Sequence, residues 1–261
     1  NHFQLTTSVS PKVLYATNYT YLSNVGKSFV RHISTYVKWI KEKTNIKKNN
    51  LIVDIGSNDG TCLDEFKKHE FQVCGVDPAS LPSKIANKKG VYTINKFFNE
   101  DVVREIINEF GYADLITSQN VLAHIENLEA TFINIYDLLK QDGFFCFEIG
   151  YFGKVLENGL FDTIYHEHLD YHHSSPLANH LSKIGFEICN LSLNNVQGGS
   201  LRVLARKNKA CSISKQAQDF LSKERKTLIY KNSFLENWEN KIKVNLVNFS
   251  NKVVNYYNKG Y

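Results

Sequence analysis

From residue 51 onward, short apolar runs alternate with longer amphipathic stretches. The apolar runs have the length of buried strands, and the stretches between them have the period of helices. Because helices separate the strands, the pattern predicts repeated strand–helix–strand units and a parallel sheet. The expected strands cover 51–56, 71–77, 91–95, 113–120 and 143–150, and the expected helices cover 60–69, 82–89, 99–110 and 124–140.

Two later apolar runs, 186–194 and 200–207, are joined by a connection too short for a crossover helix. We therefore expect them to pair antiparallel, which completes a seven-stranded, mostly parallel α/β sheet with a hairpin at its end. A helix at 174–184, with Pro176 in its first turn, should precede the hairpin.

The two ends of the chain differ from this central pattern. An irregular, aromatic-rich lead-in and an amphipathic helix at 26–44 come first, and a long amphipathic helical region at 212–258 comes last. We expect three parts: a lead-in segment over 1–50, a core over 51–210 and a helical extension over 211–261.

Composition narrows the class of protein. With 261 residues, 43% of them hydrophobic, the chain can bury a sizeable core. Its net charge of +5 comes from scattered lysines, which is typical of a solvated surface rather than a nucleic-acid site. There is no apolar run of about eighteen residues and no leader pattern, which predicts a soluble, cytoplasmic protein without a membrane partner. Because the chain starts at Asn1 and has no methionine, we expect a fragment or a processed protein.

The cysteines are odd in number and widely spaced. This pattern is typical of reduced, buried residues, and it predicts neither a disulfide framework nor a paired-cysteine metal site. They are Cys62, Cys74, Cys146, Cys189 and Cys211.

The stretch "VDIGSNDGT" stands where a strand should turn into a helix. Gly56 and Gly60 permit a tight turn and close approach of a ligand to the backbone, and Asp77 ends the next strand, where a carboxylate can accept ribose hydroxyls. The glycine spacing is not that of dinucleotide-binding enzymes, and Asp59 would repel a phosphate. The loop therefore favours S-adenosylmethionine over NAD, although the glycines taken alone could be simple turn residues.

The stretch "TIYHEHLDYHH", residues 163–173, concentrates titratable side chains. In a fully extended segment, Tyr165 and Glu167 would face away from His168, so the three can converge only if the chain bends. Closely spaced histidines and carboxylates can also bind zinc or iron, but a proton-handling role needs these groups free. His166, His172 and His173 are expected to be helix caps or surface residues.

In their order and separation, "DIGSNDGT", "GVDPA", "SQNVLAHI", "FDTIYHEHLDY" and "GGSLRV" resemble the sugar C-methyltransferase family, which acts on nucleotide-linked 4-keto-deoxysugars. The resemblance covers essentially the whole chain. It implies a class I methyltransferase core that uses S-adenosylmethionine. It also implies that an N-terminal zinc-binding domain and a C-terminal Rossmann-like domain flank this chain, so that no zinc is expected in the chain itself.

The resemblance implies roles for individual residues. The family usually has Ser-Gly where this chain has Ser23-Asn24. The residues implied to bind the cofactor are Tyr21, Ser23, Asp54, Gly56, Asn58, Gly60, Asp77, Pro78, Gln119 and Asn120, and those implied to be catalytic are His124, Tyr165, Glu167 and His168.

Methylation at carbon needs a base, because the C3–H beside a 4-keto group must be deprotonated to an enolate. Chemistry favours His168 as the base and Glu167 as the carboxylate that orients it, with Tyr165 and His124 as donors or proton relays on the enolate side. The division between Tyr165 and His168 stays open. The expected function is S-adenosylmethionine-dependent C3-methylation of a nucleotide-linked 4-keto-6-deoxysugar; methylation of oxygen or nitrogen on another small molecule, and a non-catalytic cofactor-binding role, are the alternatives.

Overall fold

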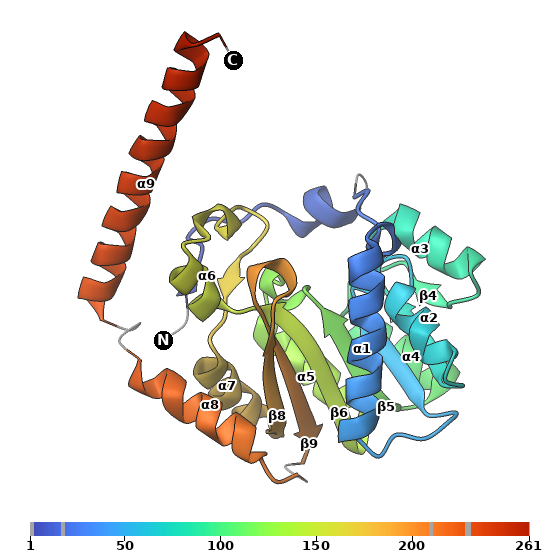
Figure 1. Ribbon diagram of the computed structural model, residues 1–261. Coiled ribbons are helices and arrows are strands. Elements are labelled where there is room, and N and C mark those ends of the chain that lie inside the picture. The colour runs from blue at the N-terminus through green and yellow to red at the C-terminus, as the bar shows by residue number, and fades with distance from the viewer. Residues whose placement is uncertain (1–2, 17–18, 209–210, 228–230, 261) are drawn as a thin grey trace.

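The computed structural model describes residues 3–16, 19–208, 211–227 and 231–260. One seven-stranded sheet forms its centre, with strand order β4-β3-β2-β5-β6-β9-β8 and helices on both faces (Figure 1). The first five strands in this order pair parallel, and β9 pairs antiparallel with both β6 and β8, as the sequence predicts. The strands are β2 (Leu51–Ile55), β3 (Gln72–Val76), β4 (Thr93–Ile94), β5 (Ala113–Gln119), β6 (Leu139–Gly150), β8 (Phe186–Asn194) and β9 (Ser200–Lys207).

Helices cover the sheet in two layers. One layer holds α1 (Lys27–Lys43), α2 (Thr61–Lys67) and α3 (Ser80–Lys88), and the other holds α4 (Glu100–Phe110), α5 (Leu128–Leu138), α7 (Ser174–Ile184) and α8 (Lys215–Lys226). Every residue of β2 is buried, because helices lie on both of its faces. This explains why the sequence of that strand is a continuous apolar run interrupted only by Asp54.

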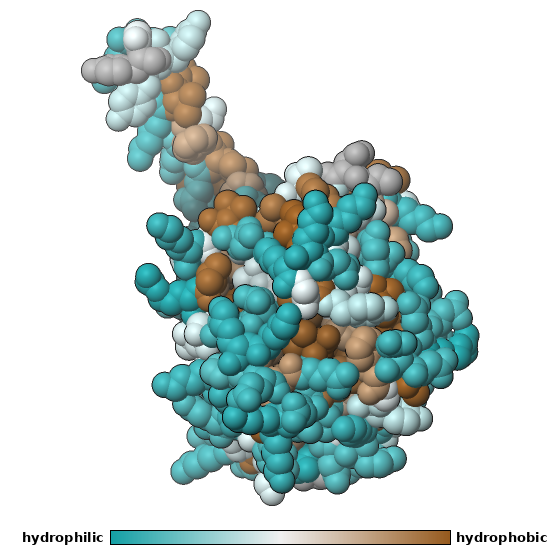
Figure 2. Space-filling view, turned by 90° about the vertical axis from the view of Figure 1, so that its right-hand side faces the viewer, coloured by the Kyte–Doolittle hydropathy of each residue, from teal (hydrophilic) through white to brown (hydrophobic). Residues whose placement is uncertain are grey.

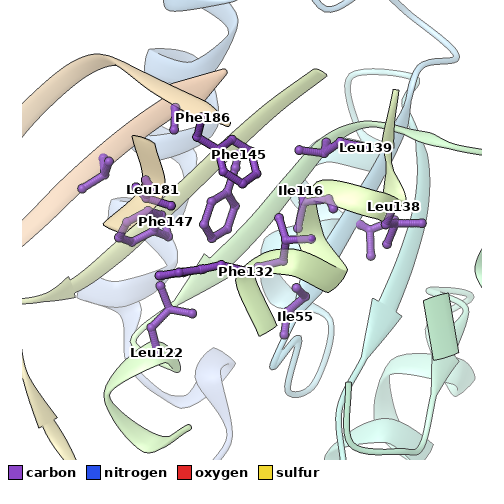
Figure 3. Packing of buried hydrophobic residues seen from close by; sticks show 14 of the residues in the cluster. Ile55, Ile116, Leu122, Phe132, Leu138, Leu139, Phe145, Phe147, Leu181 and Phe186 are labelled. Atoms are coloured by element: carbon purple, nitrogen blue, oxygen red, sulfur yellow. The ribbon is translucent and has the colours of Figure 1, made fainter. Parts of the chain in front are cut away.

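Side chains of β6 alternate between the two layers. Phe145 and Phe147 point to the α5 side and join Phe132 and Phe186 in an aromatic core (Figure 3), whereas Phe144 and Cys146 belong to the cluster under α1. The ring centroids of Phe145 and Phe147 are 4.7 Å apart. The alternation follows from the two-residue period of a strand, and it fixes the register of the sheet between its helical layers.

The order of the strands places a crevice at one end of the sheet. The chain runs outward from β2 to β3 and β4, and then returns to β5 on the other side of β2. In open α/β sheets, ligands bind beyond the carboxyl ends of the strands at this reversal. Polar residues that follow β2, β3 and β5 therefore meet at a single site.

Several elements differ from the sequence prediction. The expected helix at 124–140 begins later, because Leu122–His124 forms a 3-10 turn and the Asn127 side chain caps α5 by accepting from the Ala130 N–H. Residues after β6 form a helix, α6 (Phe152–Asn158), that the pattern did not predict. The lead-in adds β1 (Phe3–Gln4), which pairs antiparallel with β7 (Asp170–Tyr171) in a small second sheet.

The region expected as one helical stretch at 212–258 contains two helices, α8 and α9 (Asn232–Asn258). The first turns of α9 pack beside α6, where Trp238 Nε1 donates to the Leu156 carbonyl oxygen at 2.9 Å. The rest of α9 projects from the body and bears apolar side chains along its length (Figures 1 and 2). These are Val244, Leu246, Val247, Phe249, Val253, Val254, Tyr256 and Tyr257. Of the helices in the described part of the chain, none has the length and apolar character needed to cross a membrane.

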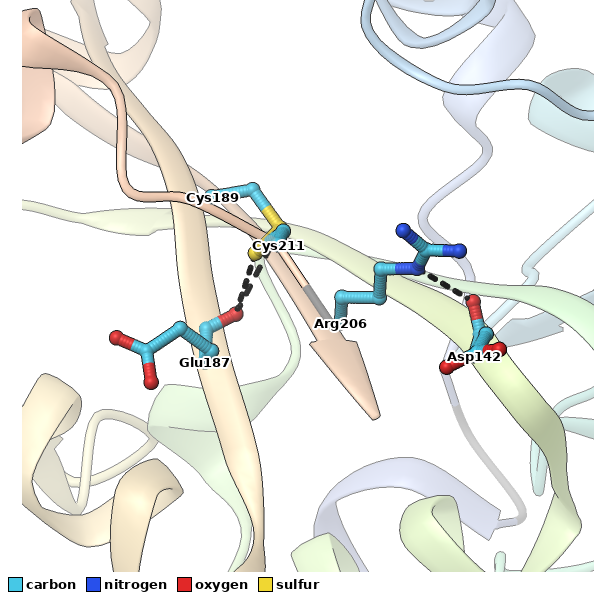
Figure 4. The surroundings of a disulfide bond; sticks show 5 residues. All are labelled: Asp142, Glu187, Cys189, Arg206 and Cys211. Carbon is cyan, nitrogen blue, oxygen red and sulfur yellow. Dashed lines mark hydrogen bonds between the residues drawn. A yellow bond between two sulfur atoms is a disulfide. The ribbon is translucent and has the colours of Figure 1, made fainter. Parts of the chain in front are cut away.

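Cys189 and Cys211 form a disulfide, so the prediction of five reduced cysteines is wrong for this pair (Figure 4). Cys189 lies on β8 and Cys211 follows β9, and the antiparallel hairpin brings them together. Both sulfurs also approach the Glu187 carbonyl oxygen, which would accept a hydrogen bond from either thiol in the reduced protein. Cys62, Cys74 and Cys146 are free and buried, as the sequence predicts.

Candidate functional site

A cavity of about 1270 Å³ lies beyond the carboxyl ends of β2, β3 and β5. Of the site residues expected from the sequence, all except Gly60 line it. This volume exceeds the roughly 300–1,000 Å³ of most small-molecule pockets, so it has room for two ligands together. The expected residues on its wall are Tyr21, Ser23, Asp54, Gly56, Asn58, Asp77, Pro78, Gln119, Asn120, His124, Tyr165, Glu167 and His168.

The two glycines of the loop after β2 have different tasks. Gly56 has φ 70°, and a Cβ there would lie 2.3 Å from a Val121 methyl carbon, so the position admits only glycine without rearrangement. Gly60 has φ 75° and packs under Ala86 and Val91, away from the cavity. Gly60 therefore shapes the start of α2 and contacts no ligand in the cavity.

Asn58 links the loop to the lead-in segment. Its side-chain oxygen accepts from the Ser23 N–H at 2.9 Å, and its side-chain nitrogen donates to the Tyr21 carbonyl oxygen at 3.0 Å. Tyr21 and Ser23 thus reach the loop through their backbones. The amide of Asn58 holds the lead-in over the cavity, a role that the sequence did not indicate.

Asp77 ends β3 with a carboxylate that organises the backbone around it. One oxygen accepts from the Asn58 N–H and the other from the Ala79 N–H, both at 2.8 Å. Burial raises the pKa of Asp77, and these two hydrogen bonds oppose that rise. The carboxylate retains further lone pairs for a ligand on the cavity side.

Asp54 lies deeper, 2% exposed, on β2. Burial raises its pKa to about 7, and a hydrogen bond from the Thr117 hydroxyl at 2.6 Å partly offsets this effect. Near neutral pH, a cationic group placed beside Asp54 would therefore bind most strongly after the carboxyl has lost its proton.

Polar atoms without protein partners mark the wall beside β5. The side-chain amide of Gln119 and the side-chain oxygen of Asn120 are buried and have no hydrogen-bond partner among the described residues. Buried polar groups normally find partners, so an unpaired set on one cavity wall is typical of a polar ligand site. Asn120 has φ 54° and donates its N–H to the Glu148 carbonyl oxygen, which fixes its position at the end of β5.

The stretch expected to handle protons does bend. The His168 N–H donates to the Tyr165 carbonyl oxygen at 3.0 Å, and the Leu169 N–H donates to the Ala123 carbonyl oxygen at 2.7 Å. The turn brings the ring centroids of Tyr165 and His168 to 4.6 Å, and those of His168 and His124 to 5.0 Å. Tyr165, His168 and His124 therefore converge on the cavity, as the resemblance implies.

One hydrogen bond sets the proton position on His168. Its Nδ1 lies 2.8 Å from the Thr163 carbonyl oxygen. Because a carbonyl oxygen can only accept, Nδ1 must carry the proton. In the neutral ring, Nε2 then retains its lone pair and can act as a base.

Two side chains next to His168 have shifted pKa values, and the two shifts have opposite signs. Burial lowers the pKa of His124, with the backbone carbonyls of Glu167 and Asn120 acting against this shift. Burial raises the pKa of Tyr165, and the carboxylate of Glu167 raises it further. Near neutral pH, Tyr165 keeps its phenolic proton and is suited to donate hydrogen bonds rather than to remove a proton.

Comparison with known families shows which family the chain belongs to. Residues 29–191, more than half of the chain, match a family model described as a methyltransferase domain. The chain belongs to this methyltransferase domain family.

A curated relative of this methyltransferase domain is C-methyltransferase NovU from Streptomyces niveus, with 32% identity over 197 residues. The match covers 76% of this chain and 47% of the relative, so the chain spans about half the length of that protein.

Solved structures with low sequence identity share the fold. A magnesium protoporphyrin IX methyltransferase from Synechocystis PCC 6803, solved with bound SAH, matches with a TM-score of 0.53 and 15% identity, over 70% of this chain and 89% of its own. A putative sarcosine dimethylglycine methyltransferase from Galdieria sulphuraria matches with a TM-score of 0.55 and 13% identity, over 69% and 87%. These matches confirm the class I methyltransferase fold.

The other histidines of the stretch at 163–173 in this methyltransferase domain differ in their exposure. His166 is exposed, as predicted. His172 and His173 are 1% exposed, so neither is a surface residue; His173 does occupy the N-cap position of α7, as predicted. His173 packs against Phe3 and Phe152, and its side chain makes no capping hydrogen bond to α7. The start of α7 is instead capped by a residue that is distant in sequence.

That cap is Glu224 of α8, which is 3% exposed. Its carboxylate accepts from the Ser174 and Ser175 N–H groups at 2.8 and 2.7 Å, and from the Tyr151 hydroxyl at 2.9 Å. Burial alone would raise the pKa of Glu224, but hydrogen bonds from the two serines bring it below its usual value. A carboxylate at a helix N-terminus also complements the helix dipole.

Sequence reasoning missed several residues of the cavity wall. Phe97, Phe98 and Asn99 line it from the segment after β4, and Gln197 lines it from the hairpin turn. Tyr15 and Tyr19 line it from the lead-in, where the aromatic-rich sequence was the available signal. Among the described residues, no group of three or more His, Cys, Asp or Glu side chains is arranged to hold a metal ion.

Proposed function

We propose that this methyltransferase domain transfers a methyl group from S-adenosylmethionine to C3 of a nucleotide-linked 4-keto-6-deoxysugar. The observation that carries the proposal is the position of His168: its Nδ1 is committed to the Thr163 carbonyl, so that Nε2 is available as a base on the cavity wall. The similarity to a C-methyltransferase supports transfer to carbon.

The cofactor fits the wall formed by the ends of β2, β3 and β5. Asp77 and Pro78 would hold its adenosine portion, and the backbone at Gly56 admits close approach. Gln119 and Asn120 offer the buried polar atoms that lack protein partners. When bound, S-adenosylmethionine supplies an electrophilic methyl group on a positively charged sulfur.

The opposite wall fits the deprotonation of a keto sugar. A 4-keto group makes the neighbouring C3–H acidic, because the electron pair left on C3 delocalises onto the keto oxygen as an enolate. Nε2 of His168 would take this proton and become cationic. The C3 carbanion would then form the new C–C bond to the methyl carbon as the methyl–sulfur bond breaks, and the electron pair of that bond would leave with the sulfur, which becomes a neutral thioether. A positioned histidine contributes roughly 10²–10⁴-fold to such a step.

The residues around His168 support the charges that develop. Tyr165 retains its phenolic proton because of burial and the nearby Glu167 carboxylate, and can donate to the enolate oxygen. The carbonyl of Thr163, rather than the Glu167 carboxylate expected from the sequence, orients the His168 ring. His124 lies beside His168 and is suited to a second donor or proton relay.

The experiment that tests the function uses the 261-residue chain, methyl-labelled S-adenosylmethionine and a panel of dTDP-, GDP- and CDP-linked 4-keto-6-deoxysugars. We expect the label on C3 of at least one sugar, identified by NMR of the product. Calorimetry with S-adenosylmethionine serves as the control for a competent cofactor site. Binding of the cofactor with no label on carbon, or with label only on oxygen or nitrogen acceptors, would reject the proposal.

A further inference from the structure

Tyr15 reaches both segments that carry the proposed proton-handling groups. It lies in a π-helical turn of the lead-in, Lys12–Ala16. Its hydroxyl is 3.0 Å from Nδ1 of His124 and donates to the Glu167 carbonyl oxygen at 3.3 Å. That carbonyl oxygen is itself 2.6 Å from Nδ1 of His124. Three groups that are distant in sequence thus meet at one point.

The hydrogen-bonding roles at this point are determined by the carbonyl. Because the Glu167 carbonyl can only accept, Nδ1 of His124 must carry a proton at a separation of 2.6 Å. The Tyr15 oxygen can share that proton through a lone pair, while its own proton goes to the carbonyl. Burial and the Glu167 carboxylate raise the pKa of Tyr15, so its hydroxyl keeps its proton.

Tyr15 also stands in a row of neighbouring rings along the cavity wall. The ring centroids of Tyr15 and His124 are 5.4 Å apart, and the row continues to His168 at 5.0 Å and on to Tyr165 at 4.6 Å. On the other side, Tyr19 lies 5.6 Å from Tyr15. A displacement of Tyr15 would therefore disturb the ring next to the proposed base.

The lead-in is anchored on both sides of Tyr15. Before it, the Leu5 N–H donates to the Leu169 carbonyl oxygen at 2.9 Å, next to the β1–β7 pairing. After it, the Ser23 N–H bonds the side chain of Asn58. Tyr15 thus lies on a segment held against both walls of the cavity, which gives its hydroxyl a defined position.

We propose that Tyr15 is a positioning residue of the active site, which holds the His124 ring and the Glu167 backbone so that His124 faces His168. The kinetic consequence rests on the proposed function, but the positioning itself does not. It follows that the lead-in belongs to the catalytic unit as well as to the cofactor site.

The test is Tyr15→Phe, which removes the hydroxyl and keeps the ring. We expect kcat to fall about tenfold, with KM for the sugar nucleotide and Kd for S-adenosylmethionine within about twofold of the unmodified values, because the loss of one hydrogen bond to a positioned group acts on the chemical step. Tyr112→Phe is the matched control, since Tyr112 is 51% exposed and precedes β5, at the end of the strand away from the cavity. It should leave kcat unchanged.

A second measurement needs no turnover. In protein with ¹⁵N-labelled histidine, the Nδ1 resonance of His124 should report a protonated nitrogen and shift in Tyr15→Phe, while the exposed His166 should not change. An unchanged His124 resonance, or a normal kcat accompanied only by a lower melting temperature, would overturn the inference. If no keto sugar is methylated but the resonance still shifts, the proposed function fails while the positioning role stands.

Discussion

The loop after β2 and the turn at 163–169 line the same cavity, but the chain builds these two walls differently. On the cofactor side, the positions follow directly from the ends of adjacent parallel strands, and the carboxylate of Asp77 is held by the N–H groups of Asn58 and Ala79. On the other side, the turn depends on segments far along the chain: Ala123, Tyr15 and Leu5 all bond its backbone.

The difference separates two kinds of construction. A wall made from strand ends inherits its geometry from the sheet, and its unpaired polar atoms are left for a ligand. A wall made from a loop must be held by contacts from elsewhere, and its titratable groups are oriented by backbone carbonyls such as those of Thr163 and Glu167. Changes on the first wall should act mainly on binding and folding, and changes on the second mainly on the rate of the chemical step.

His168→Asn should have the largest effect and would show most clearly that the two walls have different functions. We expect kcat for methyl transfer to fall roughly 10²–10⁴-fold, because the variant lacks a base near neutral pH. The Kd for S-adenosylmethionine, measured by calorimetry, should stay within about twofold. His166→Asn is the control, since His166 lies in the same turn but is exposed. A His168→Asn enzyme that retains most of its rate would favour transfer to oxygen or nitrogen instead.

Glu224→Ala tests the cap at the start of α7, the helix that follows the turn. The change removes the acceptor for two backbone N–H groups and the Tyr151 hydroxyl, all in buried surroundings. We expect the free energy of unfolding, from urea titration, to fall by about 3 kcal/mol. Glu224→Gln should lose about half as much, and Glu236→Ala, on the exposed face of α9, should lose almost nothing. Equal stability of the two Glu224 variants would argue against the hydrogen bonds as the cause.

Gly56→Ala addresses the cofactor wall. The new Cβ would meet Val121 at 2.3 Å, and φ of 70° is unfavourable for alanine, so we expect a loss of about 2 kcal/mol in the free energy of unfolding and weaker cofactor binding. Adding Val121→Ala should recover part of the loss by removing the clash. Gly150→Ala meets nothing within 4 Å and serves as the control. Full stability of the single variant would contradict the packing described for this loop.

Asp54→Asn should have the smallest effect, which is a change in how the free energy of unfolding depends on pH. The pKa of Asp54 is raised to about 7 in the folded state, from about 3.9 in the unfolded chain. The unfolded state therefore binds fewer protons between these values, and stability falls as pH rises through this window. Relative to Asp54→Asn, the unmodified protein should lose about 1 kcal/mol between pH 5 and pH 6, measured by urea titration at each pH. A parallel pH dependence in both proteins would show that Asp54 ionises normally.

The two walls also differ in how well the sequence predicts them. Strand periodicity and the glycine loop are enough to bring Asp54, Gly56 and Asp77 to one cavity, because adjacent parallel strands end at a common edge, whereas Gln119 was expected there from the family resemblance. Convergence of Tyr165 and His168 followed from the family resemblance, since alternation along an extended chain would separate them.

What the sequence did not predict depends on contacts between distant segments. His172 and His173 are both buried, and the ring of His173 packs against Phe3 and Phe152, contacts of which the local sequence pattern carries no signal. The disulfide requires the register of β8 against β9 to bring Cys211 back to Cys189. The role of Asn58 as a tether for the lead-in depends in the same way on a segment about 35 residues earlier.

The position of Glu224 limits how far this protein can be truncated from its C-terminal side. The family model ends at residue 191, and a protein shortened to end after β9, at residue 207, would keep the whole sheet and every residue of the proposed cofactor wall. It would lose the carboxylate that completes the start of α7, immediately after the segment that carries His168. Such a truncated protein should still bind the cofactor but should methylate poorly. A set of shorter forms selected only for ligand binding would therefore lose support for the proposed catalytic residues, and the selection would not detect the loss.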